Sequence, residues 1–190
     1  MRKTLLFLVI SIWGGLQVIG QNSLTGYVKY DNAAQTPMKQ NTKVHLYQSN
    51  PIVDIWVMTD NTGHYEFANI PNGTYQLYAT STRTWGGVNA LDAMLILRNF
   101  VQMPPLLTGL RLVVADVNRS GGVPNAADEM AIIKRFTNQI SSFMPPYVNS
   151  PGGPDWYSDT FNLVFTNNTV SIQNLKMLCA GDVNGSYIPF

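Results

Sequence analysis

Oxygen-bearing side chains recur at alternate positions in the middle of the chain. Asp116, Asn118 and Ser120 stand at positions one, three and five of a short loop, and Gly121 stands at position six. A hard cation such as Ca²⁺ takes six or more oxygen ligands, and a glycine at position six allows the sharp turn that brings the ligands together. The carbonyl oxygen of Gly122 offers a further ligand. This spacing predicts a calcium-binding loop.

The last ligand of this loop is expected to be Asp128, the acid that opens the following helix. Counted from Asp116, position twelve is Ala127 and Asp128 is thirteenth, so Pro124 must bulge out for the carboxylate to reach the ion. With Asp116 and Asp128 as the charged ligands, we expect a weak site of the extracellular type, of order 10⁻⁴ M or poorer.

The segment around this loop is repeated. Residues Gly86–Phe100 recur as Gly121–Phe136, and the second copy carries the extra Pro124. Each copy reads as a glycine turn, a short apolar segment and an amphipathic helix. Two Asn–Asp pairs have the spacing of a helix-capping box: Asn89 with Asp92, and Asn125 with Asp128. Capping is therefore the alternative to metal ligation for both acids.

The first copy has the helix half of a calcium loop but lacks the other half. Counted back from Asp92, positions one, three and five are Ser81, Arg83 and Trp85. The missing spacing occurs near the C-terminus, at Asp182, Asn184 and Ser186. We therefore hypothesise that these two halves meet and form one split calcium loop. The alternative is an ordinary Asp-Asn-Gly turn.

The paired units, from about Trp85 to Phe143, resemble dockerin repeats. The second unit carries most of this resemblance, because Arg83 stands where the first loop needs an oxygen ligand. The resemblance implies a compact antiparallel pair of calcium-loop and helix units that binds a cohesin-type protein partner.

A β module precedes these units. Short runs with period two lie within Leu24–Tyr30, Lys43–Tyr47, Ile52–Met58, His64–Phe67 and Thr74–Ala79. The turn sequences Asp-Asn-Thr-Gly at residues 60–63 and Pro-Asn-Gly at residues 71–73 separate the later runs. These features predict a small antiparallel β-sandwich.

Residues 59–77 resemble the signature of prealbumin-like modules, also called carboxypeptidase regulatory-like domains. The resemblance covers roughly Asn22 to Thr80 and implies a spacer, adhesive or sugar-binding accessory. Alternation along the strands predicts four core side chains: Tyr65, Phe67, Tyr75 and Leu77. A lone His64 after a turn is expected to be solvated or hydrogen-bonded, and Cys179 to be a small buried hydrophobe.

After a Pro- and Gly-rich linker, residues 161–172 are expected to form a β-hairpin around Asn167 and Asn168. The predicted fold is thus mainly β plus α: a small antiparallel β-sandwich, a dockerin-like helix pair and a C-terminal β-hairpin. The expected divisions are a signal peptide at residues 1–20, the β-sandwich at 21–82, the dockerin-like pair at 83–145, and the linker, hairpin and half calcium loop at 146–190.

The N-terminus predicts secretion. Arg2 and Lys3 precede a short apolar run that is followed by small residues ending near Gly20, which is the pattern of a cleaved signal peptide. We therefore expect an extracellular or cell-surface protein with no membrane span after cleavage. The net charge of +1 gives no basic field for nucleic acid, and two histidines with one cysteine exclude a Cys/His zinc site.

The overall order of segments also resembles modules of large secreted proteins from Bacteroidota-type bacteria. No nucleophile elbow, phosphate loop or zinc motif occurs in the sequence, so no enzymatic activity is expected. The leading interpretation is a calcium-dependent binding and assembly module that docks to a cohesin-type partner. One alternative is a carbohydrate-binding accessory of a polysaccharide-degrading system, using aromatic residues such as Trp56, Tyr75 and Tyr78. Another is a helix pair with a purely internal structural role.

Overall fold

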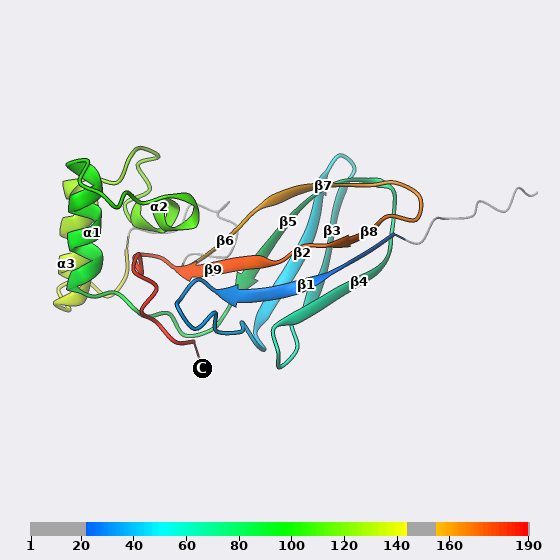
Figure 1. Ribbon diagram of the computed structural model, residues 1–190, viewed down its shortest axis with the longest axis horizontal. Helices are drawn as coiled ribbons and strands as arrows, with labels where there is room; N and C mark the ends of the chain where they lie inside the picture. The colour runs from blue at the N-terminus through cyan, green and yellow to red at the C-terminus, as the bar shows by residue number, and fades with distance from the viewer. Residues whose placement is uncertain (1–21, 144–154, 190) are drawn as a thin grey trace, which may run out of the picture.

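The computed structural model describes residues 22–143 and 155–189, so the predicted signal peptide lies outside the described residues. These residues form a mixed, mostly β fold with two sheets and three helices. Figure 1 shows the strands stacked as two layers, with the helices gathered at one end.

The first sheet has the order β4-β1-β9-β6, and β8 also pairs with β1. Its strands are β1 (Asn22–Tyr30), β4 (His64–Ile70), β6 (Trp156–Ser158), β8 (Val170–Ile172) and β9 (Leu175–Cys179). The second sheet has the order β3-β2-β5-β7. Its strands are β2 (Thr42–Ser49), β3 (Ile52–Met58), β5 (Gly73–Ser81) and β7 (Phe161–Phe165). The five predicted N-terminal strands are confirmed.

The core lies between the two sheets. Alternate residues of β1, β4 and β5 are buried, as period two requires for strands with one solvated face. The four predicted core residues Tyr65, Phe67, Tyr75 and Leu77 are each at most 3% exposed. Cys179 is also buried, and burial raises the pKa of its thiol to about 12. His64 bonds through Nε2 to the Thr25 hydroxyl at 2.8 Å.

The predicted C-terminal hairpin is wrong. The turn at residues 166–169 is present, because the Thr169 amide donates to the Thr166 carbonyl at 3.1 Å. However, β7 pairs with β5 in the second sheet, whereas β8 runs parallel to β1 in the first. The chain therefore crosses from one sheet to the other at this turn. The sequence pattern shows a reversal, but it does not show which strand each arm joins.

The C-terminal strands complete the N-terminal β module. β9 is a parallel neighbour of β1, and β7 is an antiparallel neighbour of β5. The sandwich is thus assembled from residues 22–81 and 156–179, and it is not purely antiparallel. The helices lie between these two stretches of chain, so we call residues 82–143 the helical insert.

The helical insert contains α1 (Ala90–Phe100), α2 (Gly109–Ala115) and α3 (Ala126–Phe136). α1 and α3 are the two helices predicted from the repeat, and they pack against each other with Ile96 and Ile132 fully buried. α2 was not predicted. It ends where the first predicted calcium loop begins, because Asp116 is its C-terminal cap.

Candidate calcium-binding loops

The continuous loop brings Asp116 and Asp128 together. Asp116 accepts the Ser120 amide on Oδ1 at 3.0 Å and the Gly121 amide on Oδ2 at 2.9 Å. Asp128 accepts the Asn118 amide on Oδ1 at 3.1 Å, so the thirteenth residue does reach the loop. The Asn118 side-chain oxygen accepts the Ser120 amide at 2.9 Å. Pro124, the extra residue of this copy, is buried.

The split loop has the same arrangement although its halves are far apart in sequence. Asp182 accepts the Ser186 amide on Oδ1 at 2.9 Å and the Tyr187 amide on Oδ2 at 3.1 Å. Asp92 accepts the Asn184 amide on Oδ1 at 2.8 Å, across 92 positions of chain. The Asn184 side-chain oxygen accepts the Ser186 amide at 2.7 Å. The predicted halves therefore meet.

The bonds from the loop amides to the two carboxylates and to the asparagine side chain recur in both loops. Asp116 corresponds to Asp182, and Asp128 corresponds to Asp92. The serine hydroxyls also match, since Ser120 and Ser186 both place Oγ 3.4 Å from Oδ1 of the first aspartate. An ordinary Asp-Asn-Gly turn would not reproduce contacts to a distant helix.

The two helix-opening acids also cap their helices. Asp92 Oδ2 accepts the Asn89 amide at 2.8 Å, and Asp128 Oδ2 accepts the Asn125 amide at 2.9 Å. The asparagine side chains complete both predicted capping boxes. Capping occupies one oxygen of each carboxylate and leaves the other facing the loop, so capping and ligation are compatible.

Three of the four loop aspartates are buried. Asp92, Asp128 and Asp182 are fully buried. Among the described residues, Arg and Lys pair with carboxylates elsewhere, at Asp31, which contacts Arg111 and Lys176. Desolvation by burial and, to a smaller extent, the nearby Asp182 carboxylate raise the pKa of Asp92 to about 7. A cation in the loop would offset both the desolvation of the Asp92 carboxylate and its repulsion by the Asp182 carboxylate.

The donor set suits a hard cation. Each loop offers two carboxylates, an amide oxygen and a hydroxyl, and Gly122 adds a carbonyl next to the continuous loop. The described residues contain no cluster of three or more His, Cys, Asp or Glu side chains around one point.

Tyr30 is a residue of this site that the sequence did not single out. Its hydroxyl donates to Asp182 Oδ2, and it accepts the Cys179 amide at 3.2 Å. Burial, together with Cys179 and Asp182, raises the pKa of Tyr30 far above its ordinary value, so the phenol keeps its proton. Alternation within the first strand predicts that Tyr30 faces inward, but not what it meets there.

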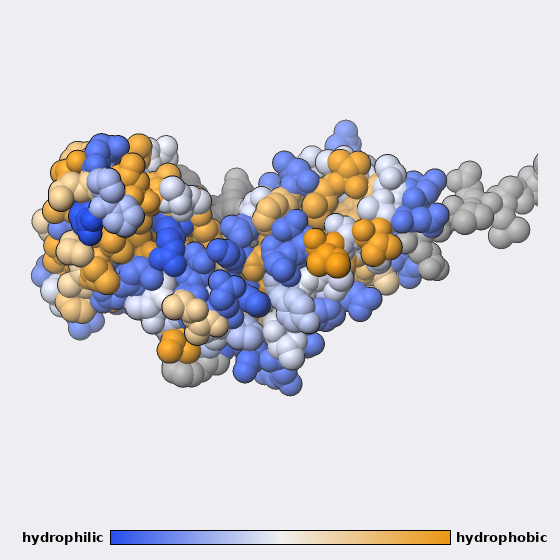
Figure 2. All heavy atoms as spheres, viewed as in Figure 1, coloured by the Kyte–Doolittle hydropathy of each residue, from blue (hydrophilic) through white to orange (hydrophobic). Residues whose placement is uncertain are grey.

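The helical insert exposes many large apolar side chains. Six of them lie on the paired helices: Leu91, Met94, Leu97 and Phe100 of α1, and Met130 and Phe136 of α3, each between 43% and 50% exposed. Met94 and Met130 occupy equivalent positions of the repeat, as do Phe100 and Phe136. Figure 2 shows this apolar surface at the helical end of the molecule.

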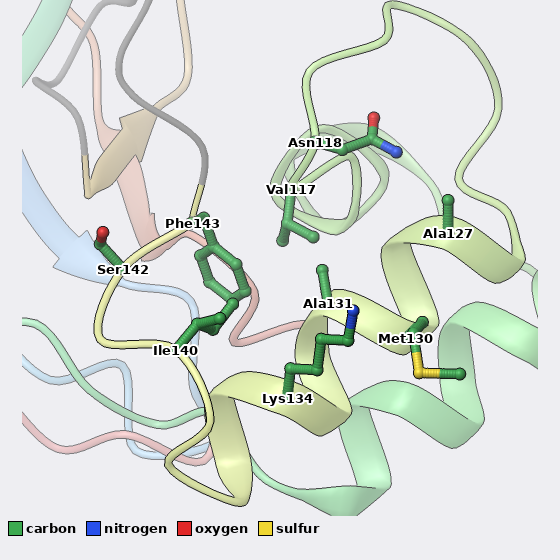
Figure 3. Close-up of a pocket in the computed structure, with 9 residues that line it drawn as sticks. All are labelled: Val117, Asn118, Ala127, Met130, Ala131, Lys134, Ile140, Ser142 and Phe143. Carbon is green, nitrogen blue, oxygen red and sulfur yellow. The ribbon is translucent and has the colours of Figure 1, made fainter.

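A hollow of about 330 Å³ adjoins the continuous loop. It lies between α3, the residues that follow α2 and the residues that follow α3 (Figure 3). Val117, Ala131 and Phe143 line it, and Asn118 of the loop forms part of its rim. The position of Asn118 therefore links the shape of this hollow to the state of the loop.

The aromatic residues considered for sugar binding are placed differently from one another. Trp56 is 49% exposed and lies beneath Lys43 Nζ, 4.1 Å from the ring centroid. Tyr78 stacks on His45, and Tyr75 is buried in the core. Trp56 and Tyr78 both pair with His45 across adjacent strands, so they share the outer face of the second sheet.

No helix among residues 22–143 and 155–189 is long and apolar enough to cross a membrane.

Comparison with known proteins shows a weak structural likeness. No protein-family model matches the chain, and no curated protein matches it. Among solved structures, the chain is similar to a DUF3823 family protein from Parabacteroides merdae ATCC 43184, with 11% sequence identity and a TM-score of 0.35. The alignment covers 84% of this chain and 47% of that one, so this chain spans about half the length of its structural neighbour.

Proposed function

We propose that this chain is a secreted, non-catalytic, calcium-dependent binding and assembly module. The observation that carries the proposal is the recurrence, in the continuous loop and the split loop, of the same bonds from loop amides to two aspartates and an asparagine. Two loops of the same geometry at the starts of two repeated helices are the arrangement that the dockerin resemblance implies. Calcium is the expected ion, because both loops offer only oxygen ligands.

In this proposal, calcium acts through the helix starts. Binding would neutralise the paired carboxylates, fix Asp92 and Asp128 at the first turns of α1 and α3, and order the rim of the hollow at Asn118. Because the ion binds the ordered loops and not the unfolded chain, it stabilises the fold as well as the docking surface.

The partner is proposed to be a cohesin-type protein domain. The exposed Leu, Met and Phe side chains of α1 and α3 support protein docking, since large apolar residues grouped on one surface mark interaction sites. They also count against a helix pair that is buried internally. The basic residues Arg98, Lys134 and Arg135 lie in the last turns of these helices and would favour an acidic rim on the partner.

Docking is tested with recombinant cohesin domains as the probe. The chain from Gln21 to Phe190 should bind such a domain in millimolar calcium and release it in excess chelator. Substituting Met94→Glu or Met130→Glu should weaken binding at least tenfold, because a charge then enters the apolar contact. The control Val164→Glu, on the outer face of the second sheet, should bind normally. Binding of the cohesin domain that does not depend on calcium would contradict the proposal. An equal loss of cohesin affinity in the Val164→Glu control would also contradict it.

A carbohydrate-binding accessory role is the second candidate, and the exposure of Trp56 favours it. Its ring, together with Tyr78, offers an aromatic surface on the second sheet, away from both loops. Affinity electrophoresis in soluble polysaccharides tests this role. Retardation of the wild-type chain that is abolished by Trp56→Ala would favour sugar binding, whereas equal mobility of the two proteins in all gels would exclude it.

A further inference from the structure

The segment that carries half of the split loop also joins the helical insert to the sandwich. We call residues 180–187, which follow β9, the C-terminal strap; it lies between the sandwich and the helices (Figure 1). Several bonds outside the loop join the strap to the insert. Among them, the Gly181 amide donates to the Val114 carbonyl at 2.9 Å, Trp85 Nε1 donates to the Ala180 carbonyl at 3.0 Å, and the Tyr187 hydroxyl donates to the Thr84 carbonyl at 2.7 Å.

The same strap is bonded to the sandwich. The Tyr30 hydroxyl donates to Asp182, and Asn32 Nδ2 donates to the Tyr187 carbonyl at 3.0 Å. Arg111 of α2 bridges both sides, because it donates to the Val183 carbonyl and to the Asp31 carbonyl, each at 2.7 Å. The strap is therefore bonded both to the helical insert and to the sandwich, and the split loop lies at this junction.

Tyr30 has a particular place in this arrangement. It is the last residue of β1, it is fully buried, and its ring packs edge-on against Trp156 and Tyr187. In the continuous loop, the donors shown for Asp116 among the described residues come from the loop itself, Ser120 and Gly121. The split loop adds to its own amides a donor from the sandwich.

This difference has a physical reason. In the continuous loop, the short chain between Asp116 and Asp128 keeps the two carboxylates in register. In the split loop, no short connection does so, and the position of Asp182 must come from tertiary contacts. A buried hydroxyl that donates to one carboxylate oxygen fixes the orientation of the other, as outer-shell hydrogen bonds do in known metal sites.

We propose that Tyr30 is the positioning residue of the split loop, and that a cation bound there fastens the helical insert to the sandwich through the C-terminal strap. This inference rests on the proposed calcium binding by the split loop. It adds that the sandwich itself sets the affinity of that loop, so calcium couples two parts of the fold.

The test uses Tyr30→Phe in a chain that also carries Asp128→Asn, so that only the split loop can bind. The matched control is Tyr65→Phe, which removes another buried hydroxyl of the same sandwich, bonded to the Gln173 carbonyl far from either loop. Calorimetric calcium titration should show affinity lowered about 10–100-fold by Tyr30→Phe and unchanged by Tyr65→Phe. The calcium-dependent rise in unfolding temperature should shrink in parallel.

A structural role alone gives a different result. If Tyr30→Phe lowers the unfolding temperature equally in calcium and in chelator, with unchanged calcium affinity, the proposal is wrong. If the chain with Asp128→Asn alone binds no calcium, both the split calcium site and this proposal fail. If that chain binds calcium and the added Tyr30→Phe leaves its calcium affinity unchanged, only the role of Tyr30 is overturned.

A second measurement needs no substitution at Tyr30. Calcium added to the Asp128→Asn chain should slow hydrogen exchange at the Cys179 and Gly181 amides, which lie outside the loop but bond to Tyr30 and to α2. Slowing confined to residues 182–187 would contradict the coupling, even if Tyr30→Phe failed to fold.

Discussion

At the scale of single residues, Asp92 and Asp128 each contribute to two structures. One oxygen caps a helix through the amide of Asn89 or Asn125, and the other faces a loop through the amide of Asn184 or Asn118. Asparagine keeps a neutral acceptor for the cap but removes the charge that a calcium ligand supplies. The two roles can therefore be separated by one substitution.

Asp92→Asn and Asp128→Asn should each remove one of the two calcium ions and leave the other. The loss of an anionic ligand weakens the affected loop, whereas the second loop keeps its own carboxylates. Calcium stoichiometry by calorimetry measures this, with far-ultraviolet circular dichroism in chelator to confirm that both helices persist. Loss of both ions from either variant would contradict independent loops.

The pKa of Asp92 predicts how stability varies with pH in the absence of metal. Burial raises this pKa from 3.8 to about 7, so between these values the folded protein holds a proton that the unfolded chain has released. The free energy of unfolding contributed by this group should then fall as pH rises through that interval. Urea unfolding in chelator at several pH values measures it. Asp92→Asn should flatten this part of the profile, and an identical profile in wild type and variant would refute the assignment.

At the scale of elements, close approach of backbone segments lets the split loop form. Gly87 has a φ of +97°, and a Cβ built there would lie 2.5 Å from the carboxyl carbon of Asp182. Gly109, at the start of α2, also has a positive φ of +54°, but a Cβ there meets nothing within 4 Å. Both glycines thus have a backbone conformation that would be strained with a side chain, but only at Gly87 would a Cβ contact the Asp182 carboxyl group.

Gly87→Ala should abolish calcium binding at the split loop, whereas Gly109→Ala should retain both ions. Both variants carry a left-handed alanine, which costs roughly 1–2 kcal/mol of stability. Only the Gly87 variant displaces the Asp182 carboxylate. Calorimetric stoichiometry together with unfolding in chelator separates the two effects. Two ions bound to Gly87→Ala with wild-type affinity would rule out the predicted clash.

The sequence predicts elements well where the pattern is local. Alternation indicates the first five strands, and the repeat indicates α1, α3 and both capping boxes. It misses α2, whose seven residues are too few to show helical periodicity. It also wrongly predicts that the two arms of residues 161–172 pair with each other. A turn sequence indicates that the chain reverses, but it does not indicate which strand each arm joins.

In the candidate site, too, some contacts follow from the sequence and others do not. The spacing of the oxygen side chains and the complementary half-loops predict which residues meet, and the structure brings both sets together. Tyr30 could not be predicted as a neighbour of Asp182, because the contact depends on the parallel pairing of β1 with β9. Parallel partners far apart in sequence leave no signal in a single chain.

At the scale of the whole molecule, the sandwich depends on both ends of the chain. β1 lies between β4 on one side and β8 and β9 on the other, and β5 lies between β2 and β7. Residues 22–81 alone would therefore expose one edge of β1 and one edge of β5, together with the apolar faces that β7 and β9 cover.

A fragment of residues 22–81 should accordingly fail to fold by itself. Thermal unfolding followed by circular dichroism should show no cooperative transition for the fragment and a single cooperative transition for the chain from Gln21 to Phe190. A fragment that melts cooperatively would show that the N-terminal strands form an independent domain, with the C-terminal strands as an addition.

Calcium titration of the chain from Gln21 to Phe190, by calorimetry with thermal unfolding alongside, tests the central claim most directly. The account predicts two bound ions with dissociation constants of about 10⁻⁴ M. In 1 mM calcium, two such sites stabilise the fold by roughly 3 kcal/mol and raise the unfolding temperature by about 6–12 °C. Absence of binding and of any temperature shift at millimolar calcium would contradict the account and leave both loops as hydrogen-bonded helix starts.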